Sequence, residues 1–436
     1  MASTRLQAQR TILNWNARRG LDYQKRPWAY LANTQTAVTF TRAGKAYAVD
    51  SNGVTYYPGY YEPRLSSVLA NDGNTYVGML QEPAATNPCL QSSDFGTTWA
   101  AVGTPTRSAA AHTASGITLD LIGDNDAAAL EGYTQTVTFT GDAVKAIAIV
   151  MKAGTSTSTV IRLRDTSAPA DRLLALITWA AGVPTVAMTT GTNLLTGLTA
   201  KAWPLADGAY VFWFQATSVT AANTNSLQVY PATAAALEVA NTGTVYAGGV
   251  MAFDAVVPTS HIPTTVATVS RAVETAVIAF PDKIQAMSGL VEFVELGTSL
   301  IANAVLMWIG AATDPFIHIR RTADGQYIAR IDNDAGATSS ATLPAGIVLG
   351  DHVRIWWELE MVTSTTMRMN ARQSINGAAF GTEVNGTTRD KDATVLSDDL
   401  YSIGCLSAGS LYVGPTVHLR HAVALGSVSA ETLALS

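Results

Sequence analysis

The sequence predicts a mainly β protein, with two tandem antiparallel β-sandwiches of the jelly-roll or lectin-like type after an N-terminal arm and a small β-rich module. Two observations lead to this fold class. Apolar and polar residues alternate in short runs such as 136–140, 160–164 and 316–320, with the two-residue period of half-buried strands. Gly, Asn, Asp and Pro separate these runs and helical stretches do not, which favours sandwiches over an α/β fold.

The N-terminal region, residues 1–36, is expected to be a partly helical arm that anchors the chain. Residues 4–19 are the best helix candidate, because Leu6, Ile12 and Leu13 give a rough apolar stripe and Gly20 would end it. The arm also gathers positive charge, which suits docking on an acidic partner, although a solvated terminus explains it equally well. The residues predicted to anchor a partner are Arg5, Arg10, Trp15, Arg18, Arg19 and Trp28.

Three further segments are predicted to follow the arm. Residues 37–100 would form the small β-rich module, residues 101–265 the first sandwich and residues 266–436 the second. Each sandwich has an aromatic strand near its middle, at 210–214 and at 353–358. The segment 257–264 between them carries two prolines, which favour an extended, fairly stiff link at a domain boundary.

The composition excludes several functional classes. The net charge is −6 and Lys and Arg are dispersed, so nucleic-acid binding is disfavoured. Two distant cysteines do not make a disulfide scaffold, and we expect neither a signal peptide nor a membrane span. Charged residues make up only 14% of the chain, which suits surfaces that pack against other copies. A homo-oligomer is expected, with a trimer as the guess.

The search for catalytic groups favours a protein that is not an enzyme. His418 and His421 form the only close histidine pair, but strand positions three apart point to opposite faces, so a shared metal is not expected. Glu358 and Glu360 share one face of a strand, as a glycosidase pair could. Ordinary surface glutamates are the favoured explanation. The other carboxylate groupings considered are Asp124/Asp126 with Glu131, Glu292/Glu295 and Asp332/Asp334.

Two kinds of ligand remain as weaker possibilities. Calcium could bind at the rim of a sandwich through Asp124, Asp126, Asp332 or Asp334, but turn-forming Asp is the favoured explanation and no cofactor is expected. Exposed aromatic rings could stack on sugars. The proposed glycan-binding rings are Trp179, Trp203 and Trp308, with a tyrosine cluster at 56–61 as a further option.

Two stretches resemble a known family. Residues 39–53 (TFTRAGKAYAVDSNG), 62–65 (EPRL), 78–87 (GMLQEPAATN) and Trp99 resemble the opening module of many tailed-phage and prophage virion proteins. Residues 259–271 (TSHIPTTVATVSR) are similar to a link that, in those proteins, joins a carbohydrate-binding-module-like jelly roll to a concanavalin/laminin-G-like sandwich. His261 stands where Tyr is more usual, and Pro88-Cys89 replaces the usual apolar pair.

The resemblance implies a virion protein assembled in the host cytoplasm. Such modules occur in tail fibres, head fibres, capsid decorations and adsorption proteins, so the position on the particle stays open. The main hypothesis is a non-catalytic structural protein exposed on the virion, with other virion proteins as partners. The alternative is a fibre or spike that binds a host-surface glycan. A polysaccharide depolymerase is the third and least favoured hypothesis.

Overall fold

The structure is a computed structural model, and it describes most of the chain between residues 64 and 390 together with shorter stretches on either side. The described residues are 11–16, 28–31, 34–37, 39–41, 48–49, 55–56, 64–188, 200–234, 239–254, 259–272, 275–279, 286–296, 304–310, 316–322, 324–332, 338–390, 400–403 and 416–425.

The chain forms two compact units, and one is inserted into the sequence of the other. Unit 1 comprises residues 1–44, 58–83 and 272–436, and unit 2 comprises residues 45–57 and 84–271. The predicted segments 101–265 and 266–436 fall within unit 2 and unit 1 respectively. The two sandwiches are therefore nested in sequence, where the prediction had them follow one another.

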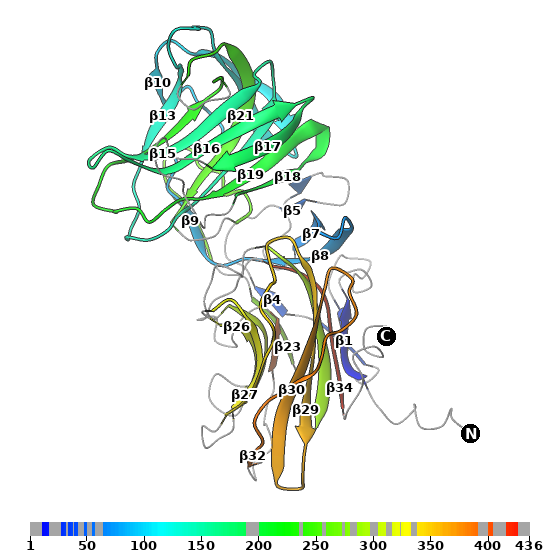
Figure 1. Cartoon of the computed structure of the whole chain (residues 1–436). Helices are drawn as coiled ribbons and strands as arrows, with labels where there is room; N and C mark the ends of the chain where they lie inside the picture. Colours follow the sequence, from blue (N-terminus) through cyan, green and yellow to red (C-terminus); the bar gives the residue numbers. More distant parts are fainter. Residues whose placement is uncertain are drawn as a thin grey trace. The chain divides into compact units, whose positions relative to one another are not determined.

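Unit 2 is a sandwich of two antiparallel sheets, each with six strands (Figure 1). One sheet has the order β10 (Ala100–Val102), β13 (Gly132–Val137), β20 (Asn225–Tyr230), β15 (Ser158–Asp165), β16 (Ala170–Ala180), β17 (Val183–Met188). The other has the order β11 (Thr106–Ala114), β12 (Ile117–Asp124), β21 (Gly243–Phe253), β14 (Ala146–Ala153), β19 (Ala209–Gln215), β18 (Ala200–Pro204). A short 3-10 helix, η2 (Ala206–Gly208), precedes β19.

Alternation along the strands builds the core of unit 2. In β15, Ile161 and Leu163 enter the interior, while Val160 and Arg162 take the intervening positions on the outer face. Aromatic residues fill the space between the sheets, and Phe212 and Phe214 of β19 are fully buried there. Two small sheets complete the unit: β9 (Ala85–Asn87) with β22 (Val269–Arg271), and β5 (Ala48–Val49) with β6 (Thr55–Tyr56).

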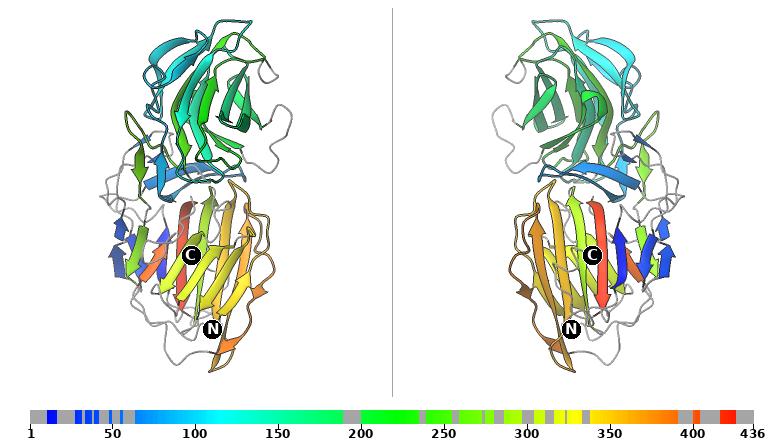
Figure 2. Two further views of the ribbon diagram at one scale, coloured as in Figure 1. Left: turned by 90° about the vertical axis from the view of Figure 1, so that its left-hand side faces the viewer. Right: turned by 90° about the vertical axis from the view of Figure 1, so that its right-hand side faces the viewer.

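Unit 1 is a second sandwich, with an eleven-stranded and a seven-stranded antiparallel sheet (Figure 2). The larger sheet has the order β3 (Thr34–Ala37), β2 (Trp28–Leu31), β1 (Thr11–Asn16), β34 (Thr416–Leu425), β24 (Met287–Glu295), β29 (His352–Met361), β30 (Thr366–Ile375), β31 (Val384–Asn385), with β32 (Arg389–Asp390) on β30 and the hairpin β7 (Arg64–Leu69), β8 (Thr75–Gln81) on β34. The smaller sheet has the order β28 (Thr338–Thr342), β27 (Tyr327–Asp332), β26 (Phe316–Arg321), β25 (Val305–Gly310), β33 (Leu400–Ile403), β23 (Thr275–Ala279), β4 (Thr39–Thr41).

The N-terminal segment differs from the predicted partly helical arm. Within the candidate helix 4–19, the described residues 11–16 form strand β1, which pairs antiparallel with the C-terminal strand β34 so that Leu13 lies opposite Val423. In the right-hand view of Figure 2, the blue strand β1 lies beside the red C-terminal strand β34. The helix prediction is wrong here because β34 offers a row of backbone hydrogen-bonding groups that only an extended neighbour can satisfy.

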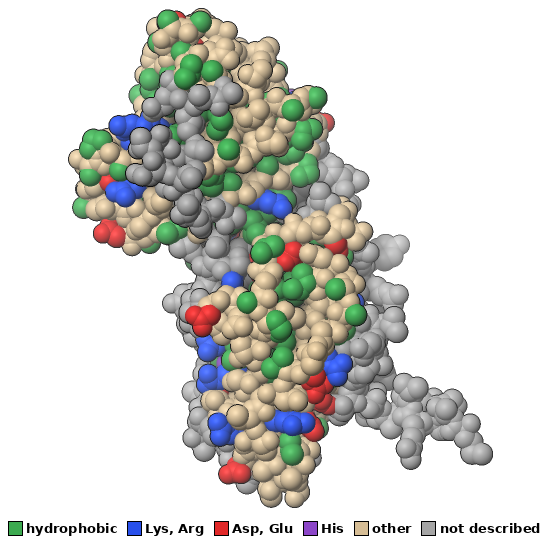
Figure 3. Space-filling view, in the orientation of Figure 1, with side chains coloured by type: hydrophobic (Ala, Val, Ile, Leu, Met, Phe, Trp, Pro, Cys, Tyr) green, Lys and Arg blue, Asp and Glu red, His purple; other side chains and the backbone are tan. Residues whose placement is uncertain are grey.

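The predicted module 37–100 is also divided between the units. Strand β4 pairs with β23, and β8 pairs with β34, so both belong to unit 1. The chain then passes into unit 2 at residue 84. On the face shown in Figure 3, charged side chains are scattered among uncharged ones.

Candidate functional site

The outer face of the sheet containing β13, β20 and β15 carries the candidate site of unit 2. Outward positions on a strand are usually well exposed, but here several are buried. Val160, Leu174 and Tyr230 are at most 8% exposed and form a small apolar cluster of their own, outside the main core. Leu130, from the loop before β13, packs against this cluster. The face is therefore partly covered by the chain's own loops.

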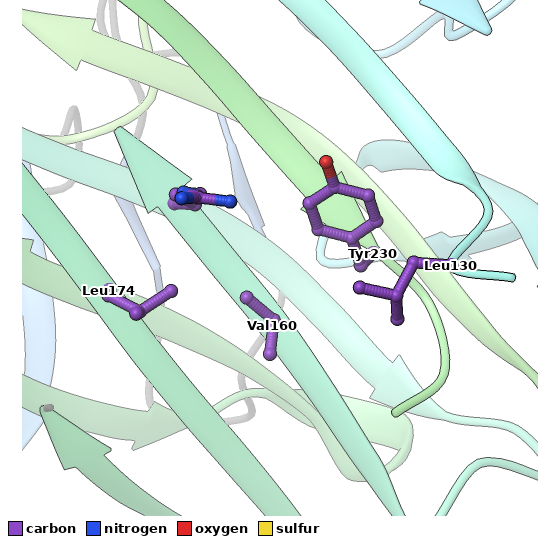
Figure 4. Close-up of a pocket in the computed structure, with 5 residues that line it drawn as sticks. Leu130, Val160, Leu174 and Tyr230 are labelled. Carbon is purple, nitrogen blue, oxygen red and sulfur yellow. The ribbon is translucent and has the colours of Figure 1, made fainter. Parts of the chain in front are cut away.

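The apolar cluster contains a dimple of about 10 Å³, room for roughly one water molecule (Figure 4). Leu130, Val160, Leu174 and Tyr230 line it together with Arg162. The Arg162 guanidinium is held by Asp171, with Nε to Oδ1 at 2.6 Å and Nη2 to Oδ2 at 3.1 Å. This bidentate pair fixes a planar, charged group beside the Tyr230 ring.

A larger groove, of about 400 Å³, lies on the same sheet. Its floor is the outer face of β13 and β20, and its sides come from the loop around Leu90 and from the turns beside Thr166 and Thr224. None of the nine lining residues is charged, and six carry a hydroxyl group. They are Leu90, Thr98, Ala100, Thr134, Gln135, Thr136, Thr166, Thr224 and Ser226.

Hydrogen bonds order the polar groups of the groove. The Thr134 and Ser226 hydroxyls are 2.6 Å apart across the strand pair β13–β20. The Gln135 side chain donates to the Leu90 carbonyl and to the Thr98 hydroxyl, both at 2.9 Å, and so holds the loop that forms one side. The groove is therefore set in position by regular strands and by internal hydrogen bonds.

Polar side chains connect the groove to the dimple along strand β20. The Gln228 amide donates to the Ser226 hydroxyl at 3.5 Å, and the Tyr230 hydroxyl donates to the Gln228 carbonyl oxygen at 3.3 Å. Arg162 stands opposite Gln228 on the neighbouring strand. The alternation of Ser226, Gln228 and Tyr230 in the sequence signals a polar outer face, but the loops that form the sides of the groove leave no such signal.

The tryptophans predicted to bind glycans do not form exposed platforms. Trp179 is 7% exposed, donates its indole N–H to the Thr159 hydroxyl and packs edge-on against Phe212 in the core. Trp308 is 6% exposed and stacks on His318. Trp203 is half-buried and stacks on Trp213. Burial withdraws the ring faces of Trp179 and Trp308 from any sugar. Of the tyrosine cluster at 56–61, only the backbone of Tyr56 is described.

The aspartates predicted as calcium ligands are engaged in other contacts. Asp124 accepts hydrogen bonds from the backbone N–H groups of Asp126 and Glu131, at 2.9 Å each, and Asp126 accepts one from Ala128. Burial raises the pKa of Asp124, which disfavours its charged form. Asp332 pairs with Arg330, and Asp334 lies outside the described residues. In the described part of the chain, no cluster of three or more His, Cys, Asp or Glu residues could hold a metal ion.

The paired glutamates of the depolymerase hypothesis also have structural partners. Glu360 accepts hydrogen bonds from Arg368 at 2.6 Å and Asn370 at 2.8 Å, and the hydrogen bond from Asn370, together with that from Arg368, lowers the pKa of Glu360. A depressed pKa suits a nucleophile more than an acid, and the neighbouring Glu358 is only 8% exposed. Neither residue lines the groove described above.

Glu292 and Glu295, on one strand of unit 1, also form separate contacts. Glu292 Oε1 lies 2.8 Å from Nε2 of His352, whose Nδ1 contacts the Tyr76 hydroxyl at 2.8 Å. Glu295 is fully buried and accepts a hydrogen bond from Tyr327 at 2.5 Å. The contacts of Glu292 and His352 join the β7–β8 hairpin to the rest of unit 1.

The histidine pair departs from the prediction. His418 and His421 lie on the same face of β34, with Nδ1 of His418 3.0 Å from Nε2 of His421. A β-bulge explains this: Glu292 and Phe293 are adjacent on β24 but lie opposite Arg420 and His418, so β34 contains one additional residue. Both histidines are fully buried.

The residues predicted to anchor a partner cannot be compared with the structure. Arg5, Arg10, Arg18 and Arg19 lie outside the described residues. Trp15 and Trp28 belong to strands β1 and β2, of which only the backbone is described. The described helical structure contains no segment long and apolar enough to cross a membrane.

Comparison with known proteins adds little to this picture. No protein-family model matches the sequence, and no curated protein matches it. Among solved structures, the chain is similar to domains LG4-5 of the mouse laminin alpha1 chain, with 12% identity, 76% of this chain and 93% of that chain covered, and a TM-score of 0.23. A likeness at this level carries no functional argument, so function is argued from the site itself.

Proposed function

We propose that this chain is a non-catalytic structural protein exposed on the surface of a tailed-phage virion. The observation that carries the proposal is the structural use of the phage-like residues. Those residues, at 39–99 and 257–271, contribute to the segments through which the sequence of unit 2 is inserted into that of unit 1. A protein that presents a domain on the surface of a particle needs a stable attachment for that domain more than it needs a catalytic site.

The attachment within unit 2 is well ordered. Strands β9 and β22, where the chain enters and leaves the unit, pair with each other. Asn87 is fully buried and donates hydrogen bonds to the carbonyls of Val250 and Ile262, while its Oδ1 accepts from the N–H groups of Cys89 and Ala252. One amide side chain thus satisfies four backbone groups from three segments.

The proposal includes self-association, because low charge leaves faces that can pack without stranding ions. A trimer is the expected form for a fibre, and other virion proteins are the expected partners of residues 1–36. Assembly in the host cytoplasm follows from the same proposal.

The test is antibody labelling of purified particles of the encoding phage. Antibodies against residues 84–271 should decorate intact particles, and the chain should be present at a fixed copy number by quantitative mass spectrometry. If the purified particles lack the chain, the proposal is wrong. Labelling only after particle disruption would contradict surface exposure.

A second candidate function, binding of a host-surface glycan, is favoured by one observation. The groove on unit 2 is uncharged and rich in hydroxyl groups, and a protein that only fills space has no need of it. The purified chain should then bind host cells and block adsorption of the phage. Unchanged adsorption in a saturating excess of the chain would exclude this role.

A further inference from the structure

We infer that the groove on the outer face of β13 and β20 binds a neutral glycan. This inference rests on the second candidate function and specifies its site and ligand class. The groove has a volume of about 400 Å³, within the usual range for small-ligand sites.

The lining determines the charge of the ligand. The nine lining residues are uncharged, so neither a phosphate nor a carboxylate would meet a counter-ion inside the groove. An ionic ligand would lose its hydration there without compensation. On the neighbouring strand β15, Arg162 and Arg164, which lies opposite Ser226, both approach the carboxylate of Asp171.

The same lining determines the chemistry of the ligand. A Ser or Thr hydroxyl both donates and accepts hydrogen bonds, and sugar hydroxyls do the same, so either partner can reorient to satisfy the other. Thr136 and Thr166 are exposed at the groove and available to such a ligand. Gln228 adds an amide group of intermediate exposure, which can address two neighbouring sugar hydroxyls at once.

The experiment measures binding of the full-length chain to immobilised neutral polysaccharides (dextran, mannan, galactan) and acidic ones (alginate, hyaluronan). Thr136→Arg places a long charged side chain on the floor of the groove, and Thr166→Arg places one on a side. Thr185→Arg is the matched control, since Thr185 is exposed on β17 at the far edge of the same sheet. Unchanged thermal unfolding verifies that each variant is folded.

The inference predicts binding to at least one neutral polysaccharide, weakened at least tenfold by Thr136→Arg or Thr166→Arg and unchanged by Thr185→Arg. Gln228→Ala should weaken it several-fold. Absence of binding to every neutral polysaccharide, or binding confined to acidic ones, overturns the inference. So does neutral-glycan binding that folded Thr136→Arg and Thr166→Arg proteins retain in full. The particle-labelling test of the virion proposal is independent of each of these outcomes.

Discussion

The two sandwiches differ most in what they bury. The hydrophobic interior of unit 2 is formed by aliphatic and aromatic side chains, among them Phe212 and Phe214, and its buried charges include ion pairs such as Lys145 with Asp254. The interior of unit 1 also contains ionisable groups: the Tyr401 hydroxyl lies 2.6 Å from Nδ1 of His421, and His421 contacts His418. Tyr401 belongs to the smaller sheet and His421 to the larger, so this contact joins the two sheets.

The polar contact makes the packing of the two sheets of unit 1 more specific, but it also makes the stability of unit 1 depend on pH. Hydrophobic burial has little directionality, whereas a polar contact between two sheets fixes their register. The cost is that the buried groups resist ionisation. Burial lowers the pKa of His418 from its usual 6.5 to about 3 and holds that of His421 well below the usual value, with His418 adding to the effect. Unit 1 is therefore expected to be the more acid-sensitive unit.

A fall in pH should produce the largest difference in stability between the two units. Burial also lowers the pKa of His318 in unit 1 to about 3 and that of His261 in unit 2 to about 4. The unfolded chain takes up these protons as the pH falls below 6.5 and the folded chain does not. The free energy of unfolding therefore has its full value above pH 6.5 and falls as the pH drops toward 3. At pH 5 the loss is about 2 kcal/mol per histidine.

The described part of unit 1 has three such histidines and that of unit 2 has one, so the loss of stability on acidification should be larger in unit 1. Calorimetry at pH 7.5 and pH 5 should show the unit 1 transition moving to lower temperature by far more than the unit 2 transition. Equal shifts would show that the buried histidines do not set the difference between the units.

Truncation of a core side chain in unit 2 should destabilise unit 2 and leave unit 1 unchanged. Phe214→Ala removes a fully buried ring and should destabilise unit 2 by about 3–5 kcal/mol. The unfolding midpoint of unit 1 should stay where it is, because the two cores are separate clusters. Loss of both transitions together in Phe214→Ala would mean that the units fold as one.

A smaller effect is expected at the contact between the sheets of unit 1. Tyr401→Phe removes the hydroxyl that contacts His421 and should cost about 1–3 kcal/mol, because the histidine loses a buried partner. Tyr210→Phe, on a half-buried tyrosine of unit 2, is the control and should change little. Chemical denaturation with peptide-resolved hydrogen exchange assigns the loss to a unit, and a loss no greater than that of Tyr210→Phe would argue against the role of this contact.

The smallest effect is expected at the surface of unit 1. Arg368→Ala removes an ion pair with Glu360 that is about one-third exposed, and such pairs contribute about 0.2–1 kcal/mol. Urea unfolding should therefore give a midpoint close to that of the parent protein. A loss of several kcal/mol would indicate that this pair supports more than local packing.

Local patterns predicted the strands well and their partners poorly. The alternating runs at 160–164 and 316–320 lie in β15 and β26, and the predicted aromatic strand at 353–358 lies in β29. The run at 11–16 was misassigned because its partner, β34, lies some 400 residues later in the sequence. The bulge in β34 that unites His418 and His421 is likewise set by pairing with β24. The groove escaped prediction for the same reason, since its floor and sides come from separate segments.

The nesting of unit 2 within unit 1 is the central claim, and separate expression of the pieces tests it most directly. Residues 84–271 should fold alone with the hydrogen-exchange protection that they have in the full chain, because β9 and β22 close the unit. Residues 272–436 should not fold alone, because β34 and β23 then lose their neighbours β1, β8 and β4. Cooperative folding of 272–436 together with failure of 84–271 would contradict the account.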